Sequence, residues 1–228
     1  MGGDALKFSE KTMRALERSA VFSGFALENI DKVLIEAEAY ELTFQKGEFV
    51  RRQGETLDFY PVVINGTVQA EMPRDRGPMI VERFATGESF AEAIPQGMGV
   101  CPVTIVAAED VLLVAIPAAN VRPEESPLFE QLSKNIAGEM TKKIGRLTAK
   151  LSMLSETRIR PRLMKYVITL PKRKDGSYIL PETRRNMAAE MGVHEKALLR
   201  ELRLLQEEGI IALDGRKLDM LRDDELYL

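Results

Sequence analysis

Residues 180–211 read LPETRRNMAAEMGVHEKALLRELRLLQEEGII, and this stretch decides the fold of the chain. Apolar residues recur at helical spacing on both sides of Gly192, which predicts two short helices joined by a sharp glycine turn. The first helix begins after Thr183, an N-cap residue, and its apolar positions are Met187, Ala188 and Met191. The second is expected to bury Ala197, Leu198, Leu202 and Leu205 and to expose its polar side.

Such a pair of helices is open to two interpretations. It can be an ordinary helical hairpin, or a helix-turn-helix whose second helix enters the major groove of DNA. The residues that follow favour the second. Gly209 ends the helix, Ile210 begins a short apolar strand, and Asp214-Gly215 is a two-residue hairpin signal before a return strand from Lys217. A helix-turn-helix followed by a hairpin is a winged helix, with Arg216 and Lys217 at the wing tip where cations meet phosphates.

The distribution of charge supports this interpretation. Residues 1–156 contain 17 basic and 23 acidic side chains, whereas residues 157–222 contain 15 basic and 9 acidic ones. The basic excess therefore lies around the helix-turn-helix, as binding to phosphates requires. The sequence lacks an apolar run long enough for a membrane span, and its single cysteine excludes an internal disulfide. We therefore expect a cytoplasmic protein without a membrane partner.

The N-terminal half has a different pattern. Residues 6–36 have apolar residues at helical spacing, interrupted around Ser23-Gly24. From Tyr40 to Pro117 the period changes to two, in short segments separated by turns such as Asn65-Gly66 and Thr86-Gly87-Glu88. Closely spaced short strands of this kind predict an antiparallel β-roll or jelly roll. The fold class is therefore α+β.

Residues 127–157 show the longest helical pattern, beginning at Pro127 after a Ser126 cap. Its apolar residues are spaced 4, 4, 3, 4 and 3, which forms a heptad-like seam. The helix could lie on its own barrel, but the narrow seam with charged flanks favours pairing with a second copy of the chain. The seam, and thus the expected dimer interface, consists of Ile136, Met140, Ile144, Leu147, Leu151 and Leu154.

The order of barrel, long helix and winged helix resembles the CRP/FNR family of bacterial transcription regulators over nearly the whole chain. The fragments that carry the resemblance are Lys46-Gly47-Glu48, Gln53-Gly54-Glu55, Val62–Val68, Gly87–Glu92 (with Ala91 in place of a glycine), Met187-Ala188, Gly192-Val193 and Arg200–Ile211. The resemblance implies a cyclic-nucleotide-binding-like sensor domain at 1–125, a dimerisation helix at 126–156 and a winged helix-turn-helix domain at 157–228. It also implies a homodimer that binds double-stranded DNA, contacts RNA polymerase where it activates, and is not an enzyme.

The resemblance assigns DNA contacts residue by residue. The family's recognition helix begins with positions that here are His194, Glu195, Lys196 and Arg200. Arg200 alone matches the family directly, and an arginine there can contact guanine through two hydrogen bonds. Glu195 either accepts a hydrogen bond from cytosine or caps the helix. Thr183 and Arg184 are candidates for phosphate contacts, as are Arg216 and Lys217, whereas Arg203 is more simply a solvated flank.

The sequence departs from the family's pattern at the positions that bind the effector. The Arg-Ser pair that holds the cyclic phosphate in cyclic-AMP-binding members falls on Pro102 and Val103, and the Thr-Ser pair that meets adenine falls on Ile144 and Gly145. Because a buried phosphate without a cation is strongly unfavourable, cyclic AMP is not expected. An iron–sulfur cluster needs several cysteine ligands, and the chain has only Cys101. A haem sensor needs a histidine in the sensor domain, whereas the single histidine lies at the DNA-binding helix. We therefore expect no cofactor.

What remains is an apolar site for a small-molecule effector, possessing one acidic residue. We expect its lining to be Phe84, Phe90, Glu92, Cys101, Val103, Met140 and Ile144. An apolar or aromatic effector fits this set, while a filled core would make the protein a ligand-independent DNA-binding regulator. Cys101 is then either a redox switch or inert packing. A metal-dependent cupin-like enzyme is disfavoured because its clustered histidines are missing.

Overall fold

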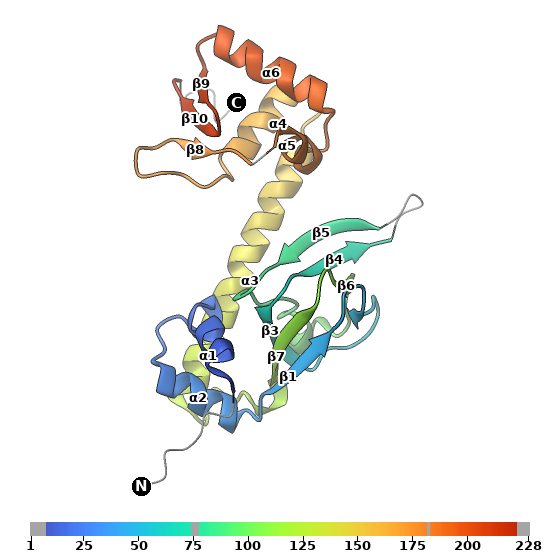
Figure 1. Ribbon diagram of the computed structural model, residues 1–228, viewed down its shortest axis with the longest axis vertical. Helices are drawn as coiled ribbons and strands as arrows, with labels where there is room; N and C mark the ends of the chain where they lie inside the picture. The colour runs from blue at the N-terminus through green and yellow to red at the C-terminus, as the bar shows by residue number, and fades with distance from the viewer. Residues whose placement is uncertain (1–7, 74–77, 182, 223–228) are drawn as a thin grey trace. The chain divides into compact units, whose positions relative to one another are not determined.

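The computed structural model describes residues 8–73, 78–181 and 183–222. It divides the chain into two compact units, Met1–Thr141 and Lys142–Leu228. The boundary lies inside the longest helix, α3 (Pro127–Leu154), drawn in yellow in Figure 1. The three-part division of the sequence into 1–125, 126–156 and 157–228 stays a prediction.

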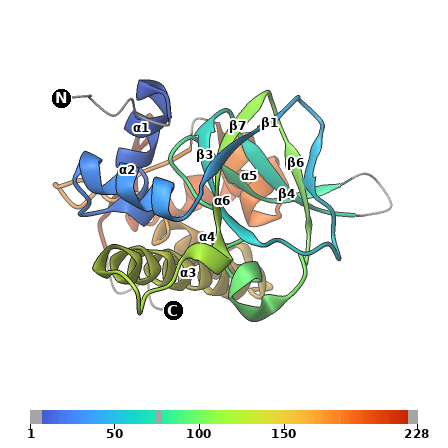
Figure 2. The ribbon, with the colours of Figure 1, turned by 90° about the horizontal axis from the view of Figure 1, so that it is seen from below.

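The first unit begins with helices that cover one sheet. They are α1 (Glu10–Glu17), the 3-10 turn η1 (Ala20–Phe22) and α2 (Leu27–Glu36), which lie beside the strands in Figure 2. Ser9 caps α1, because its side chain accepts a hydrogen bond of 3.1 Å from the Thr12 N–H. The interrupted helical pattern of the sequence is thus confirmed for the part from residue 8 onward.

The strands form two antiparallel sheets, which confirms the predicted α+β fold with an antiparallel sensor domain. One sheet has the order β1-β7-β3 and the other the order β2-β6-β4-β5. The strands are β1 (Tyr40–Phe44), β2 (Phe49–Arg51), β3 (Phe59–Asn65), β4 (Val68–Met72), β5 (Met79–Phe84), β6 (Thr104–Ala107) and β7 (Val111–Pro117). An irregular helical turn, η2 (Ile94–Met98), separates β5 from β6, and the 3-10 turn η3 (Ala118–Asn120) follows β7.

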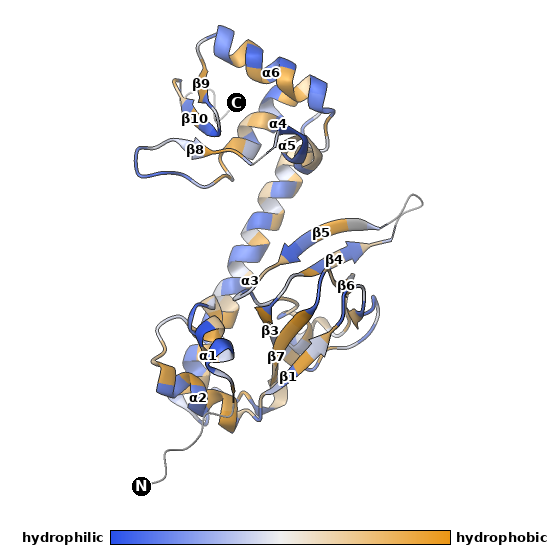
Figure 3. Ribbon diagram, in the orientation of Figure 1, coloured by the Kyte–Doolittle hydropathy of each residue, from blue (hydrophilic) through white to orange (hydrophobic). Residues whose placement is uncertain are grey.

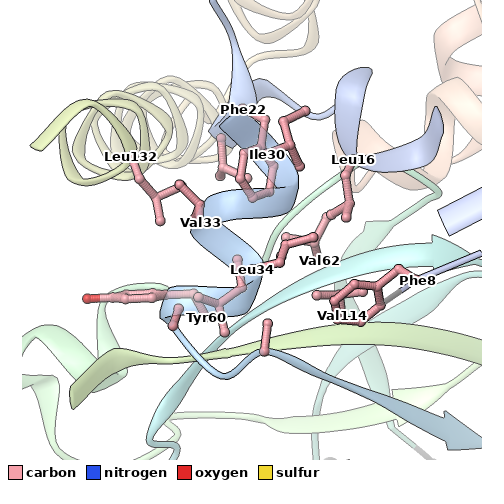
Figure 4. Packing of buried hydrophobic residues seen from close by; sticks show 14 of the residues in the cluster. Phe8, Leu16, Phe22, Ile30, Val33, Leu34, Tyr60, Val62, Val114 and Leu132 are labelled. Atoms are coloured by element: carbon pink, nitrogen blue, oxygen red, sulfur yellow. The ribbon is translucent and has the colours of Figure 1, made fainter. Parts of the chain in front are cut away.

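The paired strands β3 and β7 are apolar along their length (Figure 3) because both of their faces are buried. Alternate side chains point to opposite faces of a strand. Val62 and Val114 therefore pack with α1 and α2 (Figure 4), whereas Val63 and Leu113 pack between the two sheets. The first unit has one core on each side of the β1-β7-β3 sheet.

The structure corrects one residue of the predicted dimer seam. Ile136 is 1% exposed, because it packs with Leu132 of α3 and Phe22 in the helix-covered core of its own unit. It has no surface left for a second subunit. Met140 is partly buried against the same core. The seam residues beyond Thr141 are exposed instead: Ile144, Leu147, Leu151 and Leu154.

The second unit is a small helical domain with a three-stranded sheet. Its elements are α4 (Ile159–Val167), β8 (Tyr178–Ile179), α5 (Arg184–Met191), α6 (Glu195–Glu207), β9 (Ile211–Asp214) and β10 (Lys217–Met220). The sheet has the order β8-β10-β9. The predicted winged helix-turn-helix architecture is thereby confirmed.

Two local predictions in this unit are wrong. Asp214 pairs with Lys217, so the hairpin loop is Gly215-Arg216, one residue later than Asp214-Gly215. A positive φ of 56° at Gly215 suits the first position of such a loop. Ala197 is exposed, while Leu198, Leu202 and Leu205 are buried as predicted. The position expected for Ala197 on the buried face is taken by Glu201.

Candidate nucleic-acid interface and sensor site

The turn between α5 and α6 has the geometry of a helix-turn-helix. The Thr183 hydroxyl caps α5 by accepting a hydrogen bond of 3.0 Å from the Asn186 N–H. Gly192 ends α5 in the left-handed conformation, with φ 64° and ψ 37°, which a glycine adopts without strain. The Val193 N–H then bonds to the Ala188 carbonyl at 3.0 Å. The chain thus turns within two residues and begins α6 after His194.

The outer face of α6 carries the residues predicted to read DNA. His194, Glu195, Lys196 and Arg200 are all exposed, and Leu199 lies among them at 46% exposure. Within the described ranges, the side chains of Lys196 and Arg200 make no hydrogen bond or ion pair, and the same is true of Arg185 on α5. Arg203 differs, because it pairs with Glu207 at 2.7 Å one turn further along α6. Two cations near the start of α6 are therefore available to a ligand.

The predicted phosphate contacts beside α6 are already engaged within the unit. Arg184 donates from Nη2 to the Gly215 carbonyl at 2.8 Å, and Arg216 donates from Nε to the Leu180 carbonyl at 2.9 Å. Both bonds tie the wing to the strand and helix beside it. Lys217 lies 3.4 Å from Asp175 and 3.3 Å from Asp219, and these two carboxylates raise its pKa. Arg184, Arg216 and Lys217 thus have structural partners.

A buried carboxylate, which sequence reasoning missed, fixes α6 to α4. Arg160 donates from Nε to Glu201 at 2.7 Å and bonds to both oxygens of Glu208, at 2.6 and 2.8 Å. The two carboxylates raise the pKa of Arg160, and Arg160 in turn lowers the pKa of Glu208. The available signal was Glu201 itself: it lies three residues after Leu198, on the apolar face, where an acid requires a cation.

A second arginine of α4, also missed, joins two helix ends. Arg162 donates to the carbonyls of Leu154 at 3.3 Å, Glu156 at 3.0 Å and Met191 at 3.2 Å. The last carbonyls of a helix lack partners within the helix, so a guanidinium there satisfies them. Arg162 therefore connects the end of α3 to the end of α5.

Tyr166 adds a further link from α4 to α5. Its hydroxyl donates to Glu190 at 2.5 Å. Burial, together with this bond, raises the pKa of Tyr166, so the phenol stays protonated and remains a donor. Three side chains of α4 thus hold the two helices of the turn in place.

In the first unit, the segment Gly87–Glu92 connects β5 to η2. Ala91 adopts φ 58°, a left-handed conformation that favours glycine, at the position where the sequence motif has alanine in place of glycine. Ser89 and Glu92 are buried, and the Ser89 hydroxyl donates to Glu92. The segment therefore keeps a glycine-type backbone without its glycine.

The predicted effector residues fall into two groups. Phe84, Phe90, Cys101 and Val103 belong to the core between the two sheets, where the rings of Phe84 and Phe90 lie 5.5 Å apart. Glu92 is also buried, and it follows Ala91, which packs against this core. Met140 packs with the other core of the unit, and Ile144 belongs to the second unit and is 62% exposed. The structure thus brings together four of the seven residues.

The predicted sensor site has few groups that could bind an anion or a metal ion. Pro102 is exposed and Val103 half-buried, at the positions where the resemblance expects an arginine and a serine. Burial raises the pKa of the Cys101 thiol. The part of the chain that the structure describes holds no group of three His, Cys, Asp or Glu side chains suited to a metal ion. Of the helices within that part, none combines the length and hydropathy that a membrane crossing requires.

Comparison with known proteins finds one family model that matches part of the sensor domain. Residues 41–123 match the family model of the cyclic nucleotide-binding domain. No curated protein sequence matches the chain.

Three solved structures share the fold of the chain at low sequence identity. The c-di-GMP-responsive global regulator CLP from Xanthomonas campestris is 19% identical, with a TM-score of 0.53 over 86% of this chain and 100% of that one. The catabolite activator protein of Thermus thermophilus is 21% identical, with a TM-score of 0.52 over 91% and 96%. FixK2 from Bradyrhizobium japonicum is 16% identical, with a TM-score of 0.52 over 83% and 96%. Residues 41–123 thus resemble a cyclic nucleotide-binding domain, and the chain as a whole shares the fold of these three proteins.

Proposed function

We propose that this protein is a homodimeric, sequence-specific DNA-binding transcription regulator controlled by a small molecule. The proteins that share its fold include the catabolite activator protein of Thermus thermophilus and the global regulator CLP. The observation that carries the proposal is the outer face of α6, where Lys196 and Arg200 are exposed and uncompensated while other cations of the unit have partners. Cations on the first turns of a recognition helix face base edges and phosphates of the major groove.

Arg200 is the residue we expect to read a base. Its guanidinium matches the two acceptors of guanine in the major groove, and such a contact contributes about 1–3 kcal/mol of discrimination. Glu195, Lys196 and His194 flank it and make the half-site specific to this protein. Thr183 caps α5 through its oxygen, and its O–H remains a donor for a phosphate.

Selection of bound duplexes from a random library tests this assignment. Arg200→Ala should lose the preference for one base pair in each half-site while it still binds DNA. Arg203→Ala is the matched control, because Arg203 lies on the same helix but pairs with Glu207. A recovered motif that is unchanged in Arg200→Ala would contradict the role of Arg200, and failure to enrich any motif would contradict sequence-specific binding.

We propose that the homodimer forms through the part of α3 beyond Thr141. Ile144, Leu147, Leu151 and Leu154 are 62%, 43%, 70% and 41% exposed, and such a row of exposed apolar side chains on one helix marks an interface. Leu151→Lys should convert a dimer into a monomer in sedimentation velocity. Leu27→Lys, a comparable exposed leucine on α2, should leave the dimer intact. A protein that is monomeric without any substitution refutes the proposal.

The effector we propose is an apolar or aromatic molecule that inserts beside Phe84 and Phe90. Support comes from the apolar surroundings of Cys101 and Val103 and from the lack of an arginine at Pro102. Phe90 is 0% exposed, which favours the alternative of a filled, ligand-independent core. Mass spectrometry of the protein under native conditions, with and without an aromatic compound library, distinguishes the two. A bound aromatic that Phe90→Trp excludes supports the effector site, and no adduct from any compound supports the filled core.

A further inference from the structure

An open hollow of about 590 Å³ lies in the first unit between α1, the end of β3 and the turn before the Gly87–Glu92 segment. Two cations of α1 and one at its C-cap line it: Lys11, Arg14 and Arg18. Their spacing of three and four residues places them on one face of the helix. The floor is closed by buried apolar groups, since Ala15 and Ile64 are 7% and 1% exposed. The hollow therefore has an apolar base and one basic wall.

The charges of this wall are only partly compensated. Glu10 is the single acid among the lining residues, and its ion pair with Arg14 joins side chains that are 77% and 69% exposed. Such an exposed pair contributes little and exchanges readily for a stronger ligand. Over the described ranges, the Arg18 side chain has no hydrogen bond or ion pair. Three cations thus face one weakly held carboxylate in a concave site, and this focuses positive potential there.

The helix dipole explains only two of the three cations. Cations near the end of α1, such as Arg14 and Arg18, complement the negative end of the helix. Lys11 lies in the first turn, where the dipole disfavours a cation. It is nevertheless fixed toward the hollow, because its Nζ donates to Asn65 Oδ1 at 3.0 Å. That bond occupies the amide oxygen and leaves the Asn65 NH2 group as a further donor.

We propose that this hollow binds a small phosphate-bearing metabolite. Arginine forks match phosphate oxygens with two parallel hydrogen bonds, and a lysine adds a point charge. The Asn65 amide and the Thr86 hydroxyl supply neutral donors on the opposite wall. The volume lies within the range of small-molecule sites, about 300–1,000 Å³. This site is separate from the apolar effector position, and it does not depend on the proposed function.

The hollow also shares a residue with the segment that carries Glu92. The Gly87 N–H bonds to the Val63 carbonyl at 2.7 Å, and a Cβ at Gly87 would lie 3.9 Å from the Ala15 carbonyl. The turn therefore lies directly against the end of α1. An anion held by both walls would join α1 to the start of the segment. A polar metabolite bound there would therefore act on the position of the Gly87–Glu92 segment.

Isothermal titration of the full-length protein with inorganic pyrophosphate tests the site, with ionic strength held constant by sodium chloride. We expect saturable binding of one pyrophosphate per chain. Arg18→Gln and Lys11→Gln should each weaken it about tenfold, as loss of one charge-assisted contact does. The control is Arg52→Gln, because Arg52 is an exposed cation of the same unit that stacks on Phe49 at 3.7 Å instead of lining the hollow.

Thermal unfolding without ligand separates binding from a structural role of the cations. Arg18→Gln should keep the unfolding temperature close to that of the parent while it loses affinity. The proposal is overturned if pyrophosphate gives no saturable heat, if Arg52→Gln weakens binding as much as Arg18→Gln, or if citrate binds equally well.

Discussion

Replacing Arg162 with glutamine should loosen the helix-turn-helix from the end of α3. Arg162 donates to carbonyls at the end of α3, Leu154 and Glu156, and to the Met191 carbonyl at the end of α5. A glutamine amide is too short to span both helix ends. The substitution therefore removes the bridge while it keeps a polar side chain on α4.

The loss of stability depends on which of the three carbonyls can bind water once Arg162 is replaced. A hydrogen bond from a charged donor contributes about 1.5–3 kcal/mol where its acceptor is otherwise left without a partner. Leu154 is exposed and Glu156 half-buried, so their carbonyls can bind water in the variant, but Met191 is buried. One full bond is thus lost, not three. The expected cost is about 2 kcal/mol, or a roughly 30-fold change in a local opening equilibrium.

Hydrogen exchange of the backbone amides measures this opening directly. Protection in α5 and at Gly192 should fall about 30-fold in Arg162→Gln, whereas protection in β3 and β7 of the other unit serves as the internal reference. Arg162→Lys should restore only part of the loss, because an ammonium group lacks the planar fork that serves several acceptors. Arg203→Gln is the control for removing an arginine from the same unit. Unchanged protection in α5, or an equal loss in Arg203→Gln, would refute the reasoning.

Three further predictions concern other groups. Ala91→Gly should stabilise the first unit by about 0.5–1 kcal/mol. A left-handed alanine costs about 1–2 kcal/mol, but glycine also raises the entropy of the unfolded chain, which offsets part of the gain. A lower urea midpoint would contradict this. The Ser177 hydroxyl and N–H lower the pKa of Asp175 to about 2, so its contribution to stability is present above its ordinary pKa of 3.8 and is lost as the pH falls toward 2. Asp175→Asn should therefore flatten the acid limb of urea midpoint against pH, and parallel curves would disprove the role. Burial raises the pKa of Cys101, so iodoacetamide should alkylate it only as the first unit opens, and rapid labelling of the native protein would show an accessible thiolate.

Local signals predicted those parts of the fold that local sequence controls. Short segments between clear turns located the strands, some alternating with a period of two, as in β4, and others buried on both faces, as in β3 and β7. The turn at Gly192 was predictable since its left-handed backbone requires glycine. The resemblance to a known family located the candidate DNA contacts His194, Glu195, Lys196 and Arg200 after that glycine, and all four residues are exposed.

What the sequence did not reveal depends on segments far apart in the chain. Ile136 continues the spacing of the seam, but the packing of η1 and α2 against α3 buries it. The buried face of α6 turns toward Glu201 and away from Ala197 because Arg160, 41 residues earlier, supplies the charge that Glu201 needs. The hollow beside α1 is formed by three separate segments, so no single stretch of sequence indicates it.

The same long-range pairing changes how the basic excess of residues 157–222 should be counted. Several of its 15 cations are held by carboxylates or carbonyls of their own unit: Arg160, Arg162, Lys165, Arg184, Arg203, Arg216 and Lys217. On α5 and α6, among the described residues, Arg185, Lys196 and Arg200 make no such contact.

The salt dependence of DNA binding should therefore reflect the unpaired cations rather than net charge. Binding to B-DNA releases about 0.9 counterion per phosphate contact, so three cations in each of two protomers give a slope of about −5 for log K against log salt. Counting every basic side chain of the unit would give a slope several times steeper. Fluorescence anisotropy across a salt series measures the slope. A value near −10 would mean that Arg184, Arg216 and Lys217 leave their partners for phosphates, and that the wing rearranges when it binds.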